Sequence, residues 1–183
     1  MAPDHRYYKR LNFRRVPMEH YEVEDMFGKR RKPRLTLLCD LKDISIGNGS
    51  YKFTLQFYLA NRGKAIAKYV AFTASFFNVS IISTTGHFER LDSLRGIPSI
   101  QYNMILGVIH PHPISRVYIG EISFSVKDGN QPIRMEYEIE AEDMMPIEGK
   151  LNLSVQDLIT MKSYIDKGAK FTLTPEEQVL TFP

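Results

Sequence analysis

Alternation of apolar and polar residues, repeated in successive short segments, is the feature that most constrains how this chain folds. The segment "RLTLLCDLKD" (residues 34–43) alternates, and after the turn residues "GNGS" the segment "YKFTLQFYLA" (51–60) alternates again. A side-chain period of two places every second residue of a strand on the same face. We therefore expect two antiparallel strands here. Their core-facing residues are expected to be Leu35, Leu37, Cys39, Leu41, Tyr51, Phe53, Leu55, Phe57 and Leu59.

Strand patterns continue from there to about residue 142. After the turn "NRGK" (61–64), "IAKYVAFTASFFNV" is apolar on both faces, as in a central strand. Further strands are expected at 79–85, 100–109 and 114–127. The last strand, "IRMEYEIEAE", follows the turn "DGNQ". Its apolar residues alternate with charged ones, so we expect one of its faces to be exposed to solvent. About seven strands joined by short turns predict an all-β-dominated fold, an antiparallel immunoglobulin-like β-sandwich.

A single C-terminal helix is expected after the strands. Ser154 and Asp157 have the spacing of a capping box, apolar residues follow at helical spacing, and Gly168 is placed to end the helix. The final segment, "FTLTPEEQVLTFP", is interpreted as a short strand or a tail. We divide the chain into a strand-helix boundary segment (1–33), the β-sandwich domain (34–148), and a helix with C-terminal tail (149–183).

The opening segment differs from the rest in charge. Residues 1–34 hold ten Lys and Arg against five Asp and Glu, whereas the remaining residues hold fourteen against sixteen. Basic residues mixed with Tyr and Phe predict an extended strand or hairpin. Pro17 is then expected at the first position of a short acidic helix that ends at Gly28. A basic segment of this kind suits nucleic acid or an acidic partner, and it also suits a solvated charged face.

The segment "RYYKRLNFRRVPMEHYEVEDMF" resembles the closing part of the Schlafen/AlbA-type DNA-binding domain of prokaryotic proteins, which are often labelled ATP-binding or helix-turn-helix proteins. The matching features are the "YYKR" strand, the "VPM" entry and the "YEVEDMF" helix, within residues 5–32. The resemblance implies the end of an AlbA-like α/β fold followed by a C-terminal domain, hence a portion of a longer protein. It assigns no catalytic or nucleotide-contacting residue to this chain, because those elements of the family lie upstream of the matched segment.

The basic and aromatic residues of the opening are the candidate nucleic-acid-binding residues. Base stacking and phosphate neutralisation require these residue types close together. The candidates are Tyr7, Tyr8, Lys9, Arg10, Arg14, Arg15, Lys29, Arg30, Arg31 and Lys32. The alternative is that the same strand pairs with a sheet that is missing from this sequence. Pairing of this strand with the sheet edge of a second copy would give a homodimer.

No catalytic residue, metal site or cofactor is predicted. His110 and His112 flank Pro111 with a spacing that metal sites use, but no further ligands converge on them. Cys39 belongs to the core-facing set, so we interpret it as a small hydrophobic residue and not as a nucleophile. The chain contains no G-x-S-x-G motif.

The leading functional hypothesis is a non-catalytic β-sandwich module for sensing, oligomerisation or partner binding in a nucleic-acid-associated regulatory protein. The first alternative is direct binding of single-stranded nucleic acid through the opening segment. A lesser alternative is an enzyme whose site forms only on assembly, and the activity of the longer protein stays open. The single cysteine and the absence of a signal-peptide core favour the cytoplasm. No apolar run is long enough to cross a membrane, so no membrane partner is expected.

Overall fold

The structure is a computed structural model. It describes residues 8–11, 14–20, 23, 32–47, 49–91, 96–127, 131–168, 170–174 and 179–181. The chain divides into two compact units, Met1–Lys32 and Pro33–Pro183.

The first unit contains a β-hairpin. Strands β1 (Tyr8–Leu11) and β2 (Arg14–Pro17) pair antiparallel, as the sequence predicts. The expected helix start at Pro17 is wrong, because Pro17 lies opposite Tyr8 as the last residue of β2. A proline is tolerated at a strand end, where its missing N–H breaks no ladder. Within the expected helix, the Val23 N–H donates to the Glu19 carbonyl at 3.1 Å, and most of the remaining helix lies outside the described residues.

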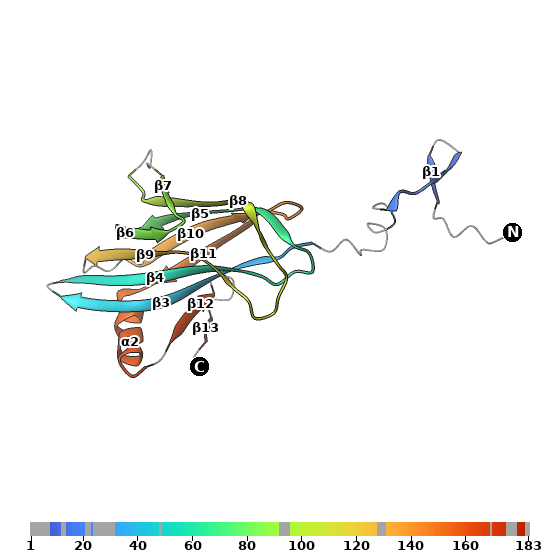
Figure 1. Cartoon of the computed structure of the whole chain (residues 1–183). Coiled ribbons are helices and arrows are strands. Elements are labelled where there is room, and N and C mark those ends of the chain that lie inside the picture. The colour runs from blue at the N-terminus through green and yellow to red at the C-terminus, as the bar shows by residue number, and fades with distance from the viewer. Residues whose placement is uncertain are drawn as a thin grey trace. The chain divides into compact units, whose positions relative to one another are not determined.

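The larger unit is built from two antiparallel sheets (Figure 1). The six-stranded sheet has the order β13 (Val179–Thr181), β12 (Phe171–Thr174), β3 (Leu35–Gly47), β4 (Ser50–Asn61), β9 (Val117–Lys127) and β6 (Ser80–Gly86). The five-stranded sheet has the order β11 (Ile147–Leu153), β10 (Ile133–Glu140), β5 (Ala67–Phe77), β8 (Ser99–Ile109) and β7 (Glu89–Leu91). The predicted antiparallel β-sandwich is confirmed. Its described strands outnumber the seven expected, because β7 and β11 were not predicted and the final segment, interpreted as a short strand or a tail, contains β12 and β13.

The sheet orders follow the immunoglobulin plan. The order β3-β4-β9-β6 corresponds to strands A-B-E-D, and β11-β10-β5-β8 corresponds to G-F-C-C′. One difference concerns the order along the chain, since β6, in the D place, comes before β8, in the C′ place. The loop between β4 and β5 is therefore the B–C loop, and that between β10 and β11 is the F–G loop.

The core lies between the sheets and is centred on aromatic rings. Phe57 packs edge-on against Phe88 at 5.6 Å and Phe76 against Phe124 at 4.9 Å between ring centroids. Edge-to-face and tilted arrangements of this kind stabilise aromatic pairs beyond their buried area. The alternating sets predicted for β3 and β4 are buried, except that Tyr51 is only half-buried.

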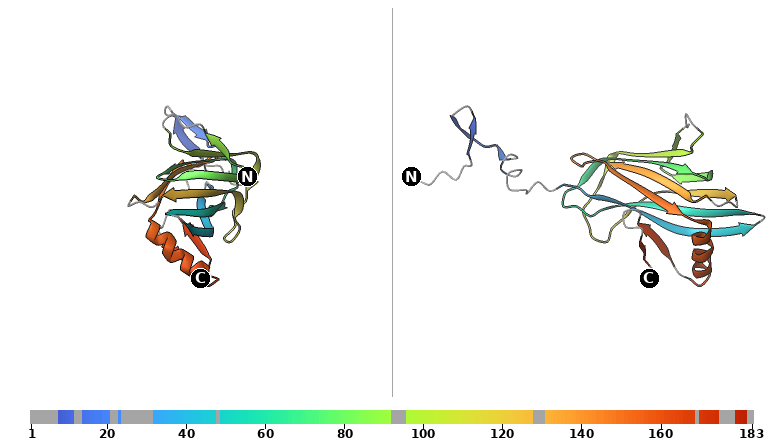
Figure 2. Two further views of the ribbon diagram at one scale, coloured as in Figure 1. Left: turned by 90° about the vertical axis from the view of Figure 1, so that its left-hand side faces the viewer. Right: turned by 180° about the vertical axis from the view of Figure 1, so that it is seen from behind.

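The C-terminal residues complete the sandwich. Helix α2 (Val155–Ile165) begins with the predicted capping box: the Asp157 N–H donates to Ser154 Oγ, and the Ser154 N–H donates to the Asp157 carboxylate. Leu158 and Met161 are its buried residues, and Figure 2 shows α2 along one side of the sheets. Strand β12 then pairs with β3. The boundary expected between residues 148 and 149 falls inside β11.

Candidate functional site

Three loops meet at one end of the sandwich, on the right of the larger unit in Figure 1. They span residues 62–66, 110–116 and 141–146, and they include the B–C and F–G loops of the immunoglobulin plan. Loops carried by a rigid sandwich are frequent binding surfaces. This end of the sandwich is therefore a candidate binding surface.

Asn61, the last residue of β4, holds this end together. Its side chain is fully buried and makes four hydrogen bonds. Its Oδ1 accepts from the backbone N–H groups of Arg34 (3.2 Å) and Gly63 (3.0 Å), and its Nδ2 donates to the carbonyls of Ala65 (2.7 Å) and Ile109 (2.9 Å). One amide thus ties the starts or ends of three strands to the B–C turn.

The 110–116 loop is held by His112. Its backbone N–H donates to the Asn61 carbonyl at 3.2 Å. Its Nδ1 accepts from the backbone N–H groups of Ile114 (3.1 Å) and Ser115 (2.9 Å). One ring nitrogen of His112 is therefore engaged by the loop itself, and in the described part of the chain no group of three His, Cys, Asp or Glu residues is arranged to hold a metal ion.

The pairing of β5 with β8 is irregular at the same end. Lys68 lies opposite Val108, but the next pair is Val70 with Met104, so Tyr69 alone faces residues 105–107. Tyr69 has φ of 51°, in the left-handed region. That conformation is uncommon for a bulky residue, and it costs on the order of 1–3 kcal/mol. Bulges of this kind redirect side chains, and here Tyr69 is 62% exposed.

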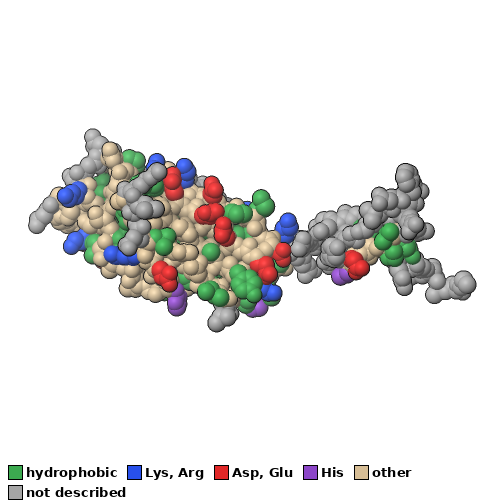
Figure 3. Space-filling view, turned by 90° about the horizontal axis from the view of Figure 1, so that it is seen from above, with side chains coloured by type: hydrophobic (Ala, Val, Ile, Leu, Met, Phe, Trp, Pro, Cys, Tyr) green, Lys and Arg blue, Asp and Glu red, His purple; other side chains and the backbone are tan. Residues whose placement is uncertain are grey.

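Further apolar side chains are exposed at this end of the sandwich. Ile105 on β8 is 70% exposed, and Val108 on the same strand and Ile66, just before β5, are each 42% exposed. Ile114 and Met145, in the adjoining loops, are more exposed still. Green hydrophobic side chains reach the surface at this end in Figure 3. Together with Tyr69, these five residues form a group that we call the apolar end: Ile66, Tyr69, Ile105, Val108, Ile114 and Met145.

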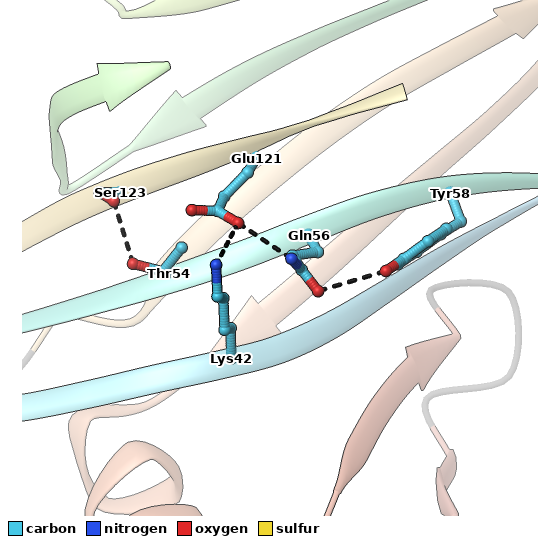
Figure 4. Close-up of polar contacts among 6 residues, drawn as sticks. All are labelled: Lys42, Thr54, Gln56, Tyr58, Glu121 and Ser123. Atoms are coloured by element: carbon cyan, nitrogen blue, oxygen red, sulfur yellow. Dashed lines mark hydrogen bonds and ion pairs between the residues drawn. The ribbon is translucent and has the colours of Figure 1, made fainter. Parts of the chain in front are cut away.

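A network of polar side chains lies on the outer face of β3, β4 and β9 (Figure 4). Glu121 accepts from Lys42 Nζ at 2.9 Å and from Gln56 Nε2 at 3.0 Å, and the Tyr58 hydroxyl donates to Gln56 Oε1 at 3.2 Å. The Arg116 guanidinium stacks over the Tyr58 ring at 4.1 Å and pairs with Asp40 at 2.8 Å. We call this network the polar face.

Within the polar face, the pair of Lys42 and Glu121 is held in its charged form. The hydrogen bond between Lys42 and Glu121 raises the pKa of the lysine and lowers the pKa of the carboxyl group. A general acid or base works best with a pKa near the operating pH, and these shifts move both groups away from neutrality. Cys39 is buried on the other side of the same sheet, and burial raises its pKa further from neutrality. Lys42 and Glu121 are therefore poorly suited to acid–base catalysis, and Cys39 is poorly suited to thiolate chemistry.

The candidate nucleic-acid-binding residues are only partly placed. Tyr7, Lys29, Arg30 and Arg31 lie outside the described residues. Tyr8 is half-buried and Lys32 is exposed. Lys9, Arg10, Arg14 and Arg15 are placed as strand positions of the hairpin, and the register sets Arg10 opposite Arg15.

No protein-family model matches this chain, and no curated protein matches it either. Within the described residues, no helix combines the length and the apolar character needed to cross a membrane. Assignment of a function therefore depends on the surfaces of the fold.

Sequence reasoning missed Asn61, Tyr69 and Ile105. Asn61 falls in a segment predicted as a turn, and its burial depends on backbone groups far away in the sequence. One local signal for the bulge does exist, because Gly107 lies inside the strand expected at 100–109, and glycine within a strand often marks a bulge.

Proposed function

We propose that the Pro33–Pro183 unit is a non-catalytic protein-contact module that binds its partner through the apolar end. The observation that carries this proposal is the bulge, where Tyr69, in a strained conformation, and Ile105 are both turned mostly toward solvent. Exposed apolar residues scattered singly are ordinary, whereas a group of them marks an interaction site.

The composition of the apolar end supports a contact function. Tyrosine is enriched at binding hot spots because it offers a large, stiff and partly polar surface. Tyr69, Ile105 and Val108 lie within the paired strands β5 and β8, and Asn61 fixes the adjoining turn, so little order has to be gained there on binding. The resemblance of residues 5–32 to the AlbA-like domain supports placing this module in a cytoplasmic, nucleic-acid-associated regulatory protein of a prokaryote.

Site-specific photocrosslinking in living cells tests the proposal. A photoreactive residue replaces Ile105 in one version of the chain and Ile82 in a matched control, because Ile82 is an exposed residue of β6, in the other sheet. We expect a defined crosslinked product from position 105 that disappears when Tyr69→Ser is added. Identical products from both positions, or none from position 105, would show that the apolar end is not a contact surface.

A second candidate function is binding of nucleic acid by the β1–β2 hairpin. The register that sets Arg10 opposite Arg15 places two positive residues at one cross-strand position, an arrangement that is unfavourable unless an anion neutralises it. A phosphate backbone is such an anion, and the sequence neighbours Tyr7 and Tyr8 have side chains of the type on which bases stack.

Titration of fluorescent single-stranded DNA at several salt concentrations tests this second candidate. We expect affinity that falls steeply with salt and is lost in the variant with Arg10→Ala, Arg14→Ala and Arg15→Ala. The matched control replaces Arg62, Arg90 and Arg134, three arginines of the larger unit, with Ala. Binding that is insensitive to salt, or equally weakened by both triple variants, would reject the hairpin as the site.

A further inference from the structure

Strand β8 has an open edge next to the apolar end. On one side it pairs with β5 along its length. On the other side β7 covers only its beginning, from Leu91 opposite Ser99 to Glu89 opposite Gln101. Among the described strands, none pairs with that side from Tyr102 to Ile109. The backbone of this stretch is therefore available for hydrogen bonds to another strand.

The open edge lacks charged residues and proline, although it contains a bulge. Native proteins guard exposed edges with charged residues or proline, among other devices. Strand β8, "SIQYNMILGVI", contains neither a charged residue nor a proline. At the opposite edge of the same sheet, β11 presents exposed Glu148 and Lys150. The bulge at 105–107 interrupts the ladder of β8 but turns Ile105 outward.

We propose that β8 pairs antiparallel with β8 of a second copy of this chain, joining two five-stranded sheets across a twofold axis. This inference rests on the proposed function and names the partner of the apolar end. The open stretch 102–109 is centred on residues 105 and 106, so a symmetric pairing places Ile105 of both copies beside the axis. Main-chain hydrogen bonds form on either side, and the Ile105 side chains of the two copies lie near the centre.

The charge pattern favours a second copy as the occupant. In a twofold contact the same patch faces itself, so any charged residue near the axis meets its own like charge. Strand β8 has no charged residue, so self-pairing carries no such penalty. The pairing also uses the open edge of both copies at once, so the assembly closes as a dimer and does not extend into a fibre.

Sedimentation velocity of the full chain over a range of concentrations tests the dimer. We expect the unmodified chain to dimerise and Ile105→Lys to weaken dimerisation by at least about tenfold, because two lysines would meet near the axis. The control Ile82→Lys adds the same charge at the open edge of β6 and is expected to leave the dimer intact. Both substituted residues are exposed, so we expect both variants to fold, and circular dichroism checks this.

Disulfide trapping gives an independent measurement. Because the only natural cysteine, Cys39, is buried, a cysteine introduced on β8 is the one accessible thiol of the described chain. We expect Ile105→Cys to give a disulfide-linked dimer on mild oxidation and Ile82→Cys to give none.

A chain that stays monomeric at high concentration, or a dimer disrupted by Ile82→Lys and not by Ile105→Lys, would overturn this inference. If position 105 then crosslinks to a different protein, the contact function stands and only the second copy fails as its partner. If it crosslinks to nothing, both fail.

Discussion

Gly149 leaves open the space that the phenol ring of Tyr137 occupies. The two residues lie opposite each other on β11 and β10, and a Cβ at position 149 would overlap the ring. We expect Gly149→Ala to destabilise the fold by about 1–3 kcal/mol, as overpacking of a core does. Urea unfolding measures this, with Asn152→Ala on the same strand as an exposed control. The Tyr137→Leu background should reduce the cost of Gly149→Ala, and strictly additive effects would contradict the steric explanation.

The buried amide of Asn61 should be one of the most sensitive positions in the chain. Asn61→Ala leaves the N–H groups of Arg34 and Gly63 and two carbonyls without their partner. We expect a loss of at least about 3 kcal/mol in the free energy of unfolding. Asn103→Ala, at an exposed asparagine, should change it by less than about 0.5 kcal/mol. Equal losses in the two variants would argue against a stabilising role for the hydrogen bonds of the Asn61 side chain.

The ion pair of the polar face should make stability depend on pH in the acid range. Lys42 donates a hydrogen bond to Glu121 and lowers its pKa below the ordinary value of 4.5. A carboxyl group with a lowered folded-state pKa adds stability above its unfolded pKa and loses it as the pH falls through the folded pKa. The stability difference between the unmodified chain and Lys42→Met should therefore be constant from neutral pH to about 5 and shrink below about 4.5. Chemical denaturation at a series of pH values measures it, and a difference that grows on acidification would contradict this explanation.

Cys39 should be unreactive while the protein is folded. Its thiol is fully buried in β3, and burial raises its pKa. The thiolate is the reactive form, so both effects suppress its reaction with a disulfide reagent. We expect the native protein to react at least roughly a thousandfold more slowly than the unfolded chain. A fast native reaction, followed by absorbance, would place the thiol at the surface.

The sandwich was predictable because alternation is a local property. In β10 the residues Ile133, Met135, Tyr137 and Ile139 are buried and their neighbours are not, as the sequence pattern indicates. Strand β11 was harder to recognise, since Gly149 stands where an apolar side chain is expected. The core volume at that place is filled from the neighbouring strand by Tyr137, which the sequence of β11 does not reveal.

The apolar end was not predictable in the same way. Tyr69 and Ile105 are ordinary strand residues by pattern, and their exposure results from a register shift between two strands far apart in the sequence. The basic opening segment, by contrast, is conspicuous in the sequence. Its role in binding nucleic acid stays a prediction, as does the resemblance to the AlbA-like domain.

The pairing of β12 with β3 has a consequence for how the protein is made. Strand β3 is the first strand of the sandwich to leave the ribosome. Its pairing with β12, in which Leu41 lies opposite Phe171, forms only after about 130 further residues have been synthesised. Because synthesis runs at about 5–20 residues per second, β3 spends several seconds without that neighbour. During this interval its apolar face and open edge depend on β4 alone, which makes the nascent chain a natural client for chaperones that shield unfinished sheets.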